Sequence, residues 1–79
     1  MDKIDKFLGK LSKQETVKMY QMISLLLAGQ EEGLNIVKLK GIENRYRLRV
    51  GNVRIIFKKE LGKNVIVNID FRGKVYKNL

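Results

Sequence analysis

The sequence predicts an α+β fold in which an N-terminal helical hairpin packs on a small antiparallel β-sheet. Apolar residues recur with a helical period over residues 4–27 and with a period of two from residue 36 onward. The dipeptide Gly51-Asn52 lies between two alternating segments, which is typical of a β-hairpin with a two-residue turn. The helices need an apolar surface to cover, and one face of the sheet is the only candidate of sufficient size.

Two helices are expected first. The apolar residues of the first helix fall at i, i+3, i+4 and i+7, namely Ile4, Phe7, Leu8 and Leu11. Ser12 with Glu15 three positions later predicts a capping box at the start of the second helix. Its apolar stripe continues to Leu27, and Gly29 predicts its C-terminal end.

Strands are expected after the polar loop at residues 30–33. Residues 36–39 form a short extended segment, residues 46–50 alternate between apolar and charged, and residues 53–57 return as the partner strand. A turn at residues 60–64 then leads to a further strand at residues 65–71. The strands therefore form an antiparallel meander.

Size and composition limit the possible functions. Residues 1–79 are expected to form a single domain, because so short a chain buries only about 60% of its unfolded surface. Cysteine and histidine are both absent, so we expect no disulfide, no metal and no cofactor. The longest apolar run, residues 23–28, is far shorter than the roughly 20 residues that cross a bilayer, and residues 1–3 begin no signal peptide. We expect no membrane contact and a cytoplasmic location.

The net charge of +9 is confined to the second part of the chain. Residues 1–35 contain five lysines and five acidic residues, whereas residues 36–79 contain twelve Lys or Arg and three acidic residues. Such a field favours a polyanion or an acidic protein as partner. A solubilising surface is the alternative, and it would explain scattered charge better than segregated charge.

A turn at Gly51-Asn52 also determines the register of the hairpin, placing Arg49 directly opposite Arg54. The core side is expected to carry Tyr46, Leu48, Val50, Val53, Ile55, Phe57, Val65, Val67, Ile69 and Phe71. The other side is expected to face solvent and to carry Arg47, Arg49, Arg54 and Arg72, with Asn68 and Asp70.

Two like charges opposite one another cost up to about 1 kcal/mol. A phosphate held between Arg49 and Arg54 would convert that repulsion into bidentate recognition, so we interpret this side as a phosphate site. In the structural alternative, Asp70 and other acids neutralise the arginines. Because Arg54 is expected to be solvent-exposed, the stability of Arg54→Ala is expected to stay within about 0.5 kcal/mol of the parent, or to rise as the repulsion from Arg49 is removed.

Three segments resemble the RelE/ParE toxin superfamily. Residues 38–41 (KLKG), 46–57 (YRLRVGNVRIIF) and 72–76 (RGKVY) look like the family patterns KLKG, YRLRVGDYRVIY and HRREVY. The resemblance is strong over residues 36–76 and loose over residues 3–29. Family members usually begin with a strand, whereas here the helical pattern begins almost at Met1, so the resemblance implies a RelE-like domain that lacks the usual first strand or a shortened sequence.

The resemblance to RelE-type members implies a toxin of a type II toxin–antitoxin system. Such a toxin enters the ribosomal decoding site and cuts mRNA without metal until an acidic antitoxin neutralises it. The implied partners are therefore the antitoxin, the ribosome and mRNA. The implied catalytic residues are Arg54, Arg72 and Tyr76. The implied RNA-phosphate-binding residues are Lys38, Lys40, Arg47, Arg49 and Lys74.

Cleavage by the 2′-hydroxyl needs a proton acceptor, a proton donor and cations around the transition state. Arg54 and Arg72 are the candidates for charge stabilisation. Tyr76 is the leading candidate for proton transfer. A role as a hydrophobic anchor is an equal alternative for this residue. Lys74 or Lys38 is the second candidate for proton transfer.

Departures from the family pattern leave two other functions open. Phe71 occupies the position often held by histidine, and arginine stands at strand positions where other members use lysine as a base. One alternative is a ParE-like inhibitor of DNA gyrase without catalytic activity. The other is a degenerate toxin that only binds RNA.

Overall fold

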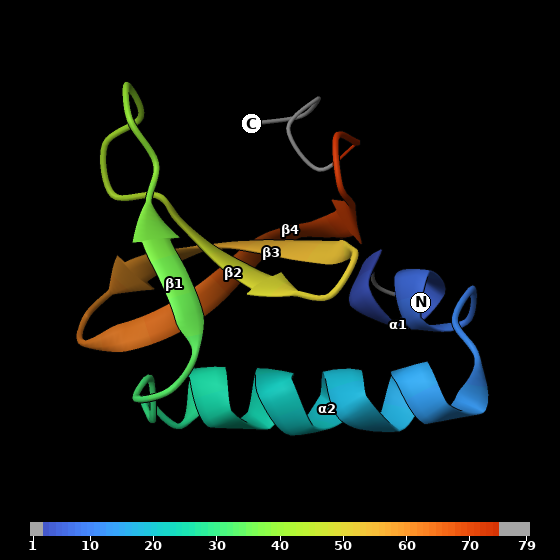
Figure 1. The fold of residues 1–79 in the computed structure, drawn as a ribbon. Coiled ribbons are helices and arrows are strands. Elements are labelled where there is room, and N and C mark those ends of the chain that lie inside the picture. The colour runs from blue at the N-terminus through green and yellow to red at the C-terminus, as the bar shows by residue number, and fades with distance from the viewer. Residues whose placement is uncertain (1–2, 75–79) are drawn as a thin grey trace.

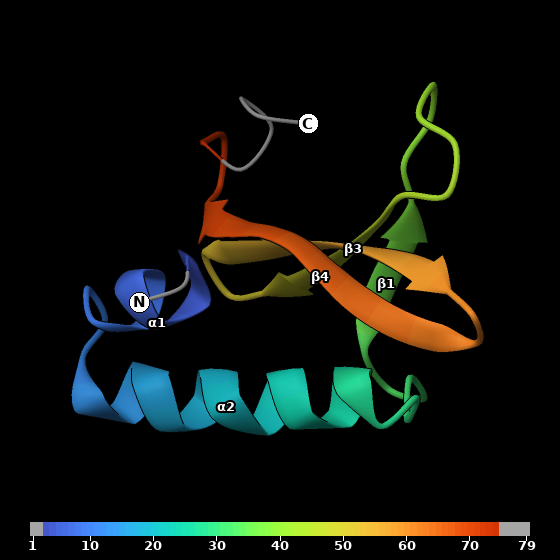
Figure 2. The same cartoon turned by 180° about the vertical axis from the view of Figure 1, so that it is seen from behind.

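A computed structural model describes residues 3–74 of the chain. The elements are α1 (Lys3–Leu8), α2 (Lys13–Leu27), β1 (Asn35–Lys38), β2 (Tyr46–Val50), β3 (Val53–Glu60) and β4 (Lys63–Phe71). The four strands form one antiparallel sheet in the order β1-β2-β3-β4. Helix α2 runs along one face of the sheet, and α1 lies between the N-terminal end of α2 and the end of β4 (Figures 1 and 2). The predicted α+β fold is confirmed.

Helix α2 begins and ends where the sequence predicts. The Ser12 hydroxyl accepts a hydrogen bond from the Glu15 N–H at 3.2 Å, and the Glu15 carboxylate accepts one from the Ser12 N–H at 3.0 Å. Helix α1 is shorter than predicted, because the Lys10 and Leu11 N–H groups bond three residues back and tighten the chain into a turn. Neither helix within residues 3–74 has the length and hydrophobicity needed to span a bilayer.

The extended segment before the hairpin is strand β1, which pairs with β2 and makes the sheet four-stranded. The first element that the structure describes is α1. The β2–β3 register agrees with the prediction at every pair, from Val50 opposite Val53 to Tyr46 opposite Phe57. Strands β3 and β4 are joined by the two-residue turn Leu61-Gly62.

The hydrophobic core lies between the helices and one face of the sheet. It contains Phe7, Leu8, Met19, Ile23, Leu26, Leu48, Val50, Val53, Ile55, Phe57 and Ile69. Phe71 packs against this core, with its ring centroid 5.0 Å from that of Phe7. The core side predicted for β2 and β3 is therefore correct.

The core side predicted for the first half of β4 is wrong. Ile56 lies opposite Asn68 but Phe57 lies opposite Ile66, so a β-bulge adds one residue to β4. The added residue reverses the alternation, and Ile66 packs against the core in place of Val65 and Val67. Val65 is consequently exposed.

Candidate functional site

The face of the sheet that points away from the helices carries two rows of residues, which we call the outer face. Residues directly opposite on neighbouring antiparallel strands point to the same side. One row consists of Asn35, Arg49, Arg54 and Asp70. The other row consists of Val37, Arg47, Ile56 and Asn68. The predicted arginines of β2 and β3 therefore do share one face.

Arg54 is buried on this face, which corrects the expectation that it faces solvent. Only 6% of the Arg54 surface is exposed. Its Nη1 donates hydrogen bonds to the Gly51 carbonyl at 2.8 Å and to the Val53 carbonyl at 3.1 Å. Burial of a guanidinium is costly unless acceptors replace water, and the backbone of the β2–β3 turn supplies two. Arg54 thus has a structural role whatever else it does.

The residues beside Arg54 are buried as well. Ile56 is fully buried and Asn68 is 3% exposed, although neither faces the helices. Strand alternation predicts which side a residue points to, but it does not predict how deeply that side is buried. The middle of the outer face is therefore buried, and its exposed residues lie at the margins.

The exposed cations lie at the margins of the outer face. Arg49 is exposed and Arg47 is half-buried. Arg72 is also exposed, and its N–H donates to the Asn52 carbonyl at 2.9 Å, which holds the end of β4 beside the β2–β3 turn. Arg49, Arg54 and Arg72 therefore lie at the same end of the sheet. Lys74 is exposed in the turn that follows β4.

The remaining predicted site residues are placed differently. Lys38 pairs with Tyr46 in the register, so it points to the side opposite to Arg47. Lys40 is exposed in the loop between β1 and β2, which extends away from α2 (Figure 1). Tyr76 lies outside the described residues.

Asp70 is the acidic residue of the outer face. It lies opposite Arg54, as the structural alternative requires, and its Oδ1 accepts a hydrogen bond from the Phe71 N–H at 2.8 Å. Asn35 extends the same row beyond Arg49 and was not predicted as a site residue. The sequence contained no signal for it, because β1 begins one residue before the apolar alternation.

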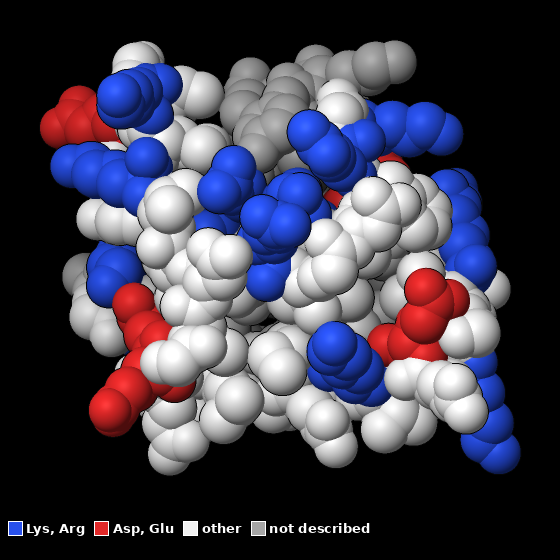
Figure 3. Space-filling view, in the orientation of Figure 1, with Lys and Arg blue, Asp and Glu red and all other residues white. Residues whose placement is uncertain are grey.

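The charge distribution on the surface follows the division of the sequence. Figure 3 shows Lys and Arg gathered over the sheet, whereas the surface over α2 is mainly uncharged. Guanidinium and ammonium groups on one surface can bind several phosphates of a nucleic-acid backbone. Residues 3–74 contain no group of three or more His, Cys, Asp or Glu that could hold a metal ion. The arrangement is therefore suited to anion binding.

Comparison with known proteins shows a similarity to a solved structure. No family model matches the chain, and no curated protein matches it. Among solved structures, the chain is similar to a chain in the crystal structure of the RelB-RelE antitoxin-toxin complex from Methanococcus jannaschii. The TM-score is 0.73 at 25% sequence identity, and the alignment covers 90% of this chain and 86% of that chain. The two helices and the four-stranded sheet thus form a toxin–antitoxin fold.

Proposed function

We propose that this chain is the toxin of a toxin–antitoxin pair and that it cleaves mRNA on the ribosome. The observation that carries the proposal is the cluster of Arg49, Arg54 and Arg72 at one end of the sheet, in a chain similar to part of a RelB-RelE complex. A net charge of +9 favours the toxin over the antitoxin, because the antitoxin of such a pair is the acidic partner.

Arg49 and Arg72 are the groups that would contact RNA phosphate directly, since both are exposed. Each guanidinium presents a planar fork that matches two phosphate oxygens. Arg54 would act from beneath them, because its charge is buried and held by the turn carbonyls. A fixed charge in a water-poor environment stabilises developing negative charge strongly.

Proton transfer needs other residues, because arginine is a poor proton acceptor. We assign it to Tyr76, with Lys74 as the second candidate. Lys74 follows Arg72 by two residues and is exposed. Lys38 is less suitable, since the register places it on the other side of the sheet.

An acidic antitoxin would neutralise the toxin by covering the outer face. Electrostatic attraction would draw it to the sheet rather than to residues 1–35, which carry no net charge. Co-expression with an acidic antitoxin is expected to give a stable complex and to relieve growth arrest. Both proteins would act in the cytoplasm, where the ribosomes are.

Purified ribosomes carrying a bound mRNA provide the test. The parent chain is expected to cut the message in the decoding site. Arg72→Ala is expected to lower the cleavage rate about a hundredfold or more, as removal of a transition-state donor usually does. Lys6→Ala removes an exposed cation from α1 and is the matched control, with no expected effect. Uncut mRNA with the parent chain would refute cleavage.

Inhibition of DNA gyrase is the second candidate function. It is favoured by Phe71, which packs against Phe7 and so cannot replace the base that other members place there. A supercoiling assay run beside the ribosome assay separates the two functions. Inhibited supercoiling with intact mRNA would establish the gyrase function, and RNA binding without either activity would indicate a non-catalytic homologue.

A further inference from the structure

The solvent side of α2 carries no charge over most of its length. Residues 19–30 are twelve consecutive uncharged residues in a chain that is 32% charged. Val17, Tyr20 and Leu27 are each more than half exposed along this helix. A helix that faces water normally carries charged residues on its outer side. This side of α2 therefore has the composition of a contact surface.

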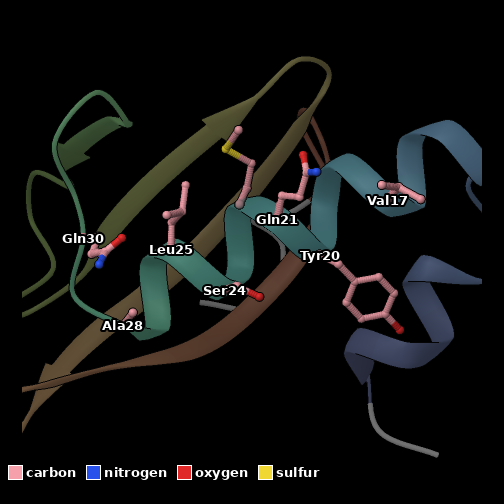
Figure 4. A pocket seen from close by; sticks show the side chains of 8 residues that line it. Val17, Tyr20, Gln21, Ser24, Leu25, Ala28 and Gln30 are labelled. Carbon is pink, nitrogen blue, oxygen red and sulfur yellow. The ribbon is translucent and has the colours of Figure 1, made fainter.

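The same side has a shape that a second helix can enter. A shallow groove of about 750 Å³ runs along it and is lined by Val17, Tyr20, Ser24, Leu25 and Ala28 among others. Figure 4 shows Tyr20, Ser24 and Ala28 following one another along the helix, with Leu25 on an adjacent side. Because Ser24 and Ala28 are small, another helix can approach closely between the larger side chains.

We infer that this groove is occupied by a second copy of the chain, with the two α2 helices antiparallel across a two-fold axis. An acidic partner would be attracted to the side of the sheet, because residues 36–79 carry the whole charge excess. Residues 1–35 carry no net charge, so two copies can meet through their helices without bringing their basic faces together. The basic sheets then point outward on both sides of the dimer.

The charges at the two ends of α2 fit this orientation. Lys13 begins the helix, and the exposed Glu32 follows its C-terminal end. In an antiparallel pair, Lys13 of one copy lies at the level of Glu32 of the other, and the symmetry repeats that contact. A parallel pair would instead place Lys13 beside Lys13, at a cost from like charges.

The contact is small, which sets the expected affinity. Helix α2 has 15 residues and so is about 22 Å long. Two such helices bury less than the roughly 1,200–2,000 Å² of a standard interface. We therefore expect a weak dimer, with a Kd in the micromolar range. This inference does not depend on the proposed toxin function.

Sedimentation equilibrium of the full chain tests it between about 1 and 500 μM, a range that brackets that Kd. The average mass is expected to rise from that of one chain toward that of two. Ser24→Lys places a charge at the centre of the contact and is expected to weaken dimerisation at least about tenfold. Asn35→Lys adds the same charge to the outer face and is expected to dimerise like the parent. If Ser24→Lys does not retain the parent circular dichroism spectrum, Gln21→Lys replaces it.

A charge exchange tests the orientation. Lys13→Glu is expected to weaken the dimer, and Lys13→Glu combined with Glu32→Lys is expected to restore it. A parent chain that stays monomeric at every concentration overturns the inference, as does a Ser24→Lys variant that dimerises normally. A monomeric parent whose complex with an acidic protein is lost on Ser24→Lys also overturns it, and assigns the groove to that protein.

Discussion

The Arg54 guanidinium contacts the backbone of the turn that precedes it, and this contact distinguishes Arg54 from the other arginines of the sheet. Two carbonyls at 2.8 and 3.1 Å accept from the same nitrogen, and the residue is nearly inaccessible to water. Arg49, directly opposite, is exposed. Arg49 and Arg54, which are equivalent in the hairpin pattern, are therefore expected to contribute differently to stability.

Arg54→Ala is expected to destabilise the fold by about 2 kcal/mol. The variant loses two hydrogen bonds to a charged group, and the two carbonyl groups that accepted them are left without a donor. In a chain of this size, that loss lowers the melting temperature by about 10 °C. Arg49→Ala is expected to stay within about 0.5 kcal/mol of the parent. Thermal unfolding followed by circular dichroism gives both values. Equal melting temperatures for the two variants would show that burial of Arg54 contributes nothing to stability.

Glu31 couples the loop after α2 to the β3–β4 hairpin. A hydrogen bond from the Asn64 side chain, together with Lys59 at 3.3 Å, holds the pKa of Glu31 below its ordinary value of 4.5. A carboxylate whose pKa is lowered by folding stabilises the fold above its unfolded pKa. That contribution is lost as the pH falls below 4.5 and through the folded pKa.

Glu31→Gln should therefore be less stable than the parent at pH 7, and the two melting temperatures should converge as the pH is lowered from 5 toward 3. The pKa of Glu15 is lowered by the Ser12 backbone and hydroxyl, and it changes charge in the same range. Because both proteins retain Glu15, the difference between them isolates Glu31. A constant difference over this pH range would exclude the carboxylate charge as the cause.

Among the elements, the β3–β4 hairpin contains an unfavourable turn residue. Leu61 adopts φ 52° and Gly62 adopts φ 77°, a pair of left-handed residues that favours Asn-Gly. A leucine in this conformation costs about 1 kcal/mol or more. Its side chain is 96% exposed, so no packing offsets that cost.

Leu61→Asn is expected to stabilise the fold by about 0.5–1 kcal/mol, since asparagine tolerates the left-handed region. Leu61→Ala removes the same exposed apolar group but keeps the backbone strain, and it is expected to melt close to the parent. Urea unfolding of the three proteins gives the free energies. If Leu61→Ala raises the free energy of unfolding as much as Leu61→Asn does, the exposed leucine side chain, and not the backbone conformation, is what destabilises the parent.

The molecule as a whole separates its charge by layer. Residues 1–35, which contain both helices, carry no net charge, whereas residues 36–79, which contain most of the sheet and the segment after it, carry the entire excess. Uncharged side chains therefore cover most of α2, whereas Lys and Arg gather over the sheet (Figures 3 and 4). A single small chain can in this way present two independent surfaces.

RNA binding is accordingly expected to depend steeply on salt. With about four phosphate contacts on a single strand, affinity should fall about fiftyfold between 50 and 200 mM salt. Arg49→Ala combined with Arg72→Ala should reduce the slope of log K against log salt by about 1.4. Fluorescence anisotropy with a labelled RNA measures the slope. A slope that is unchanged in the double variant would place the RNA elsewhere on the molecule.

Local sequence patterns were sufficient to predict the parts of the fold that depend on near neighbours. The Ser12–Glu15 capping box determines the start of α2, and Gly51-Asn52 determines the register of β2 and β3, because each acts over only a few residues. That register in turn predicted that Arg47, Arg49 and Arg54 share one face of the sheet. Tertiary structure decided what depends on distant segments: the bulge opposite Phe57, the side on which Lys38 lies, and the burial of Arg54. Alternation along a strand specifies a direction for each side chain, but only the neighbouring strands and the chain packed around them determine whether water reaches it.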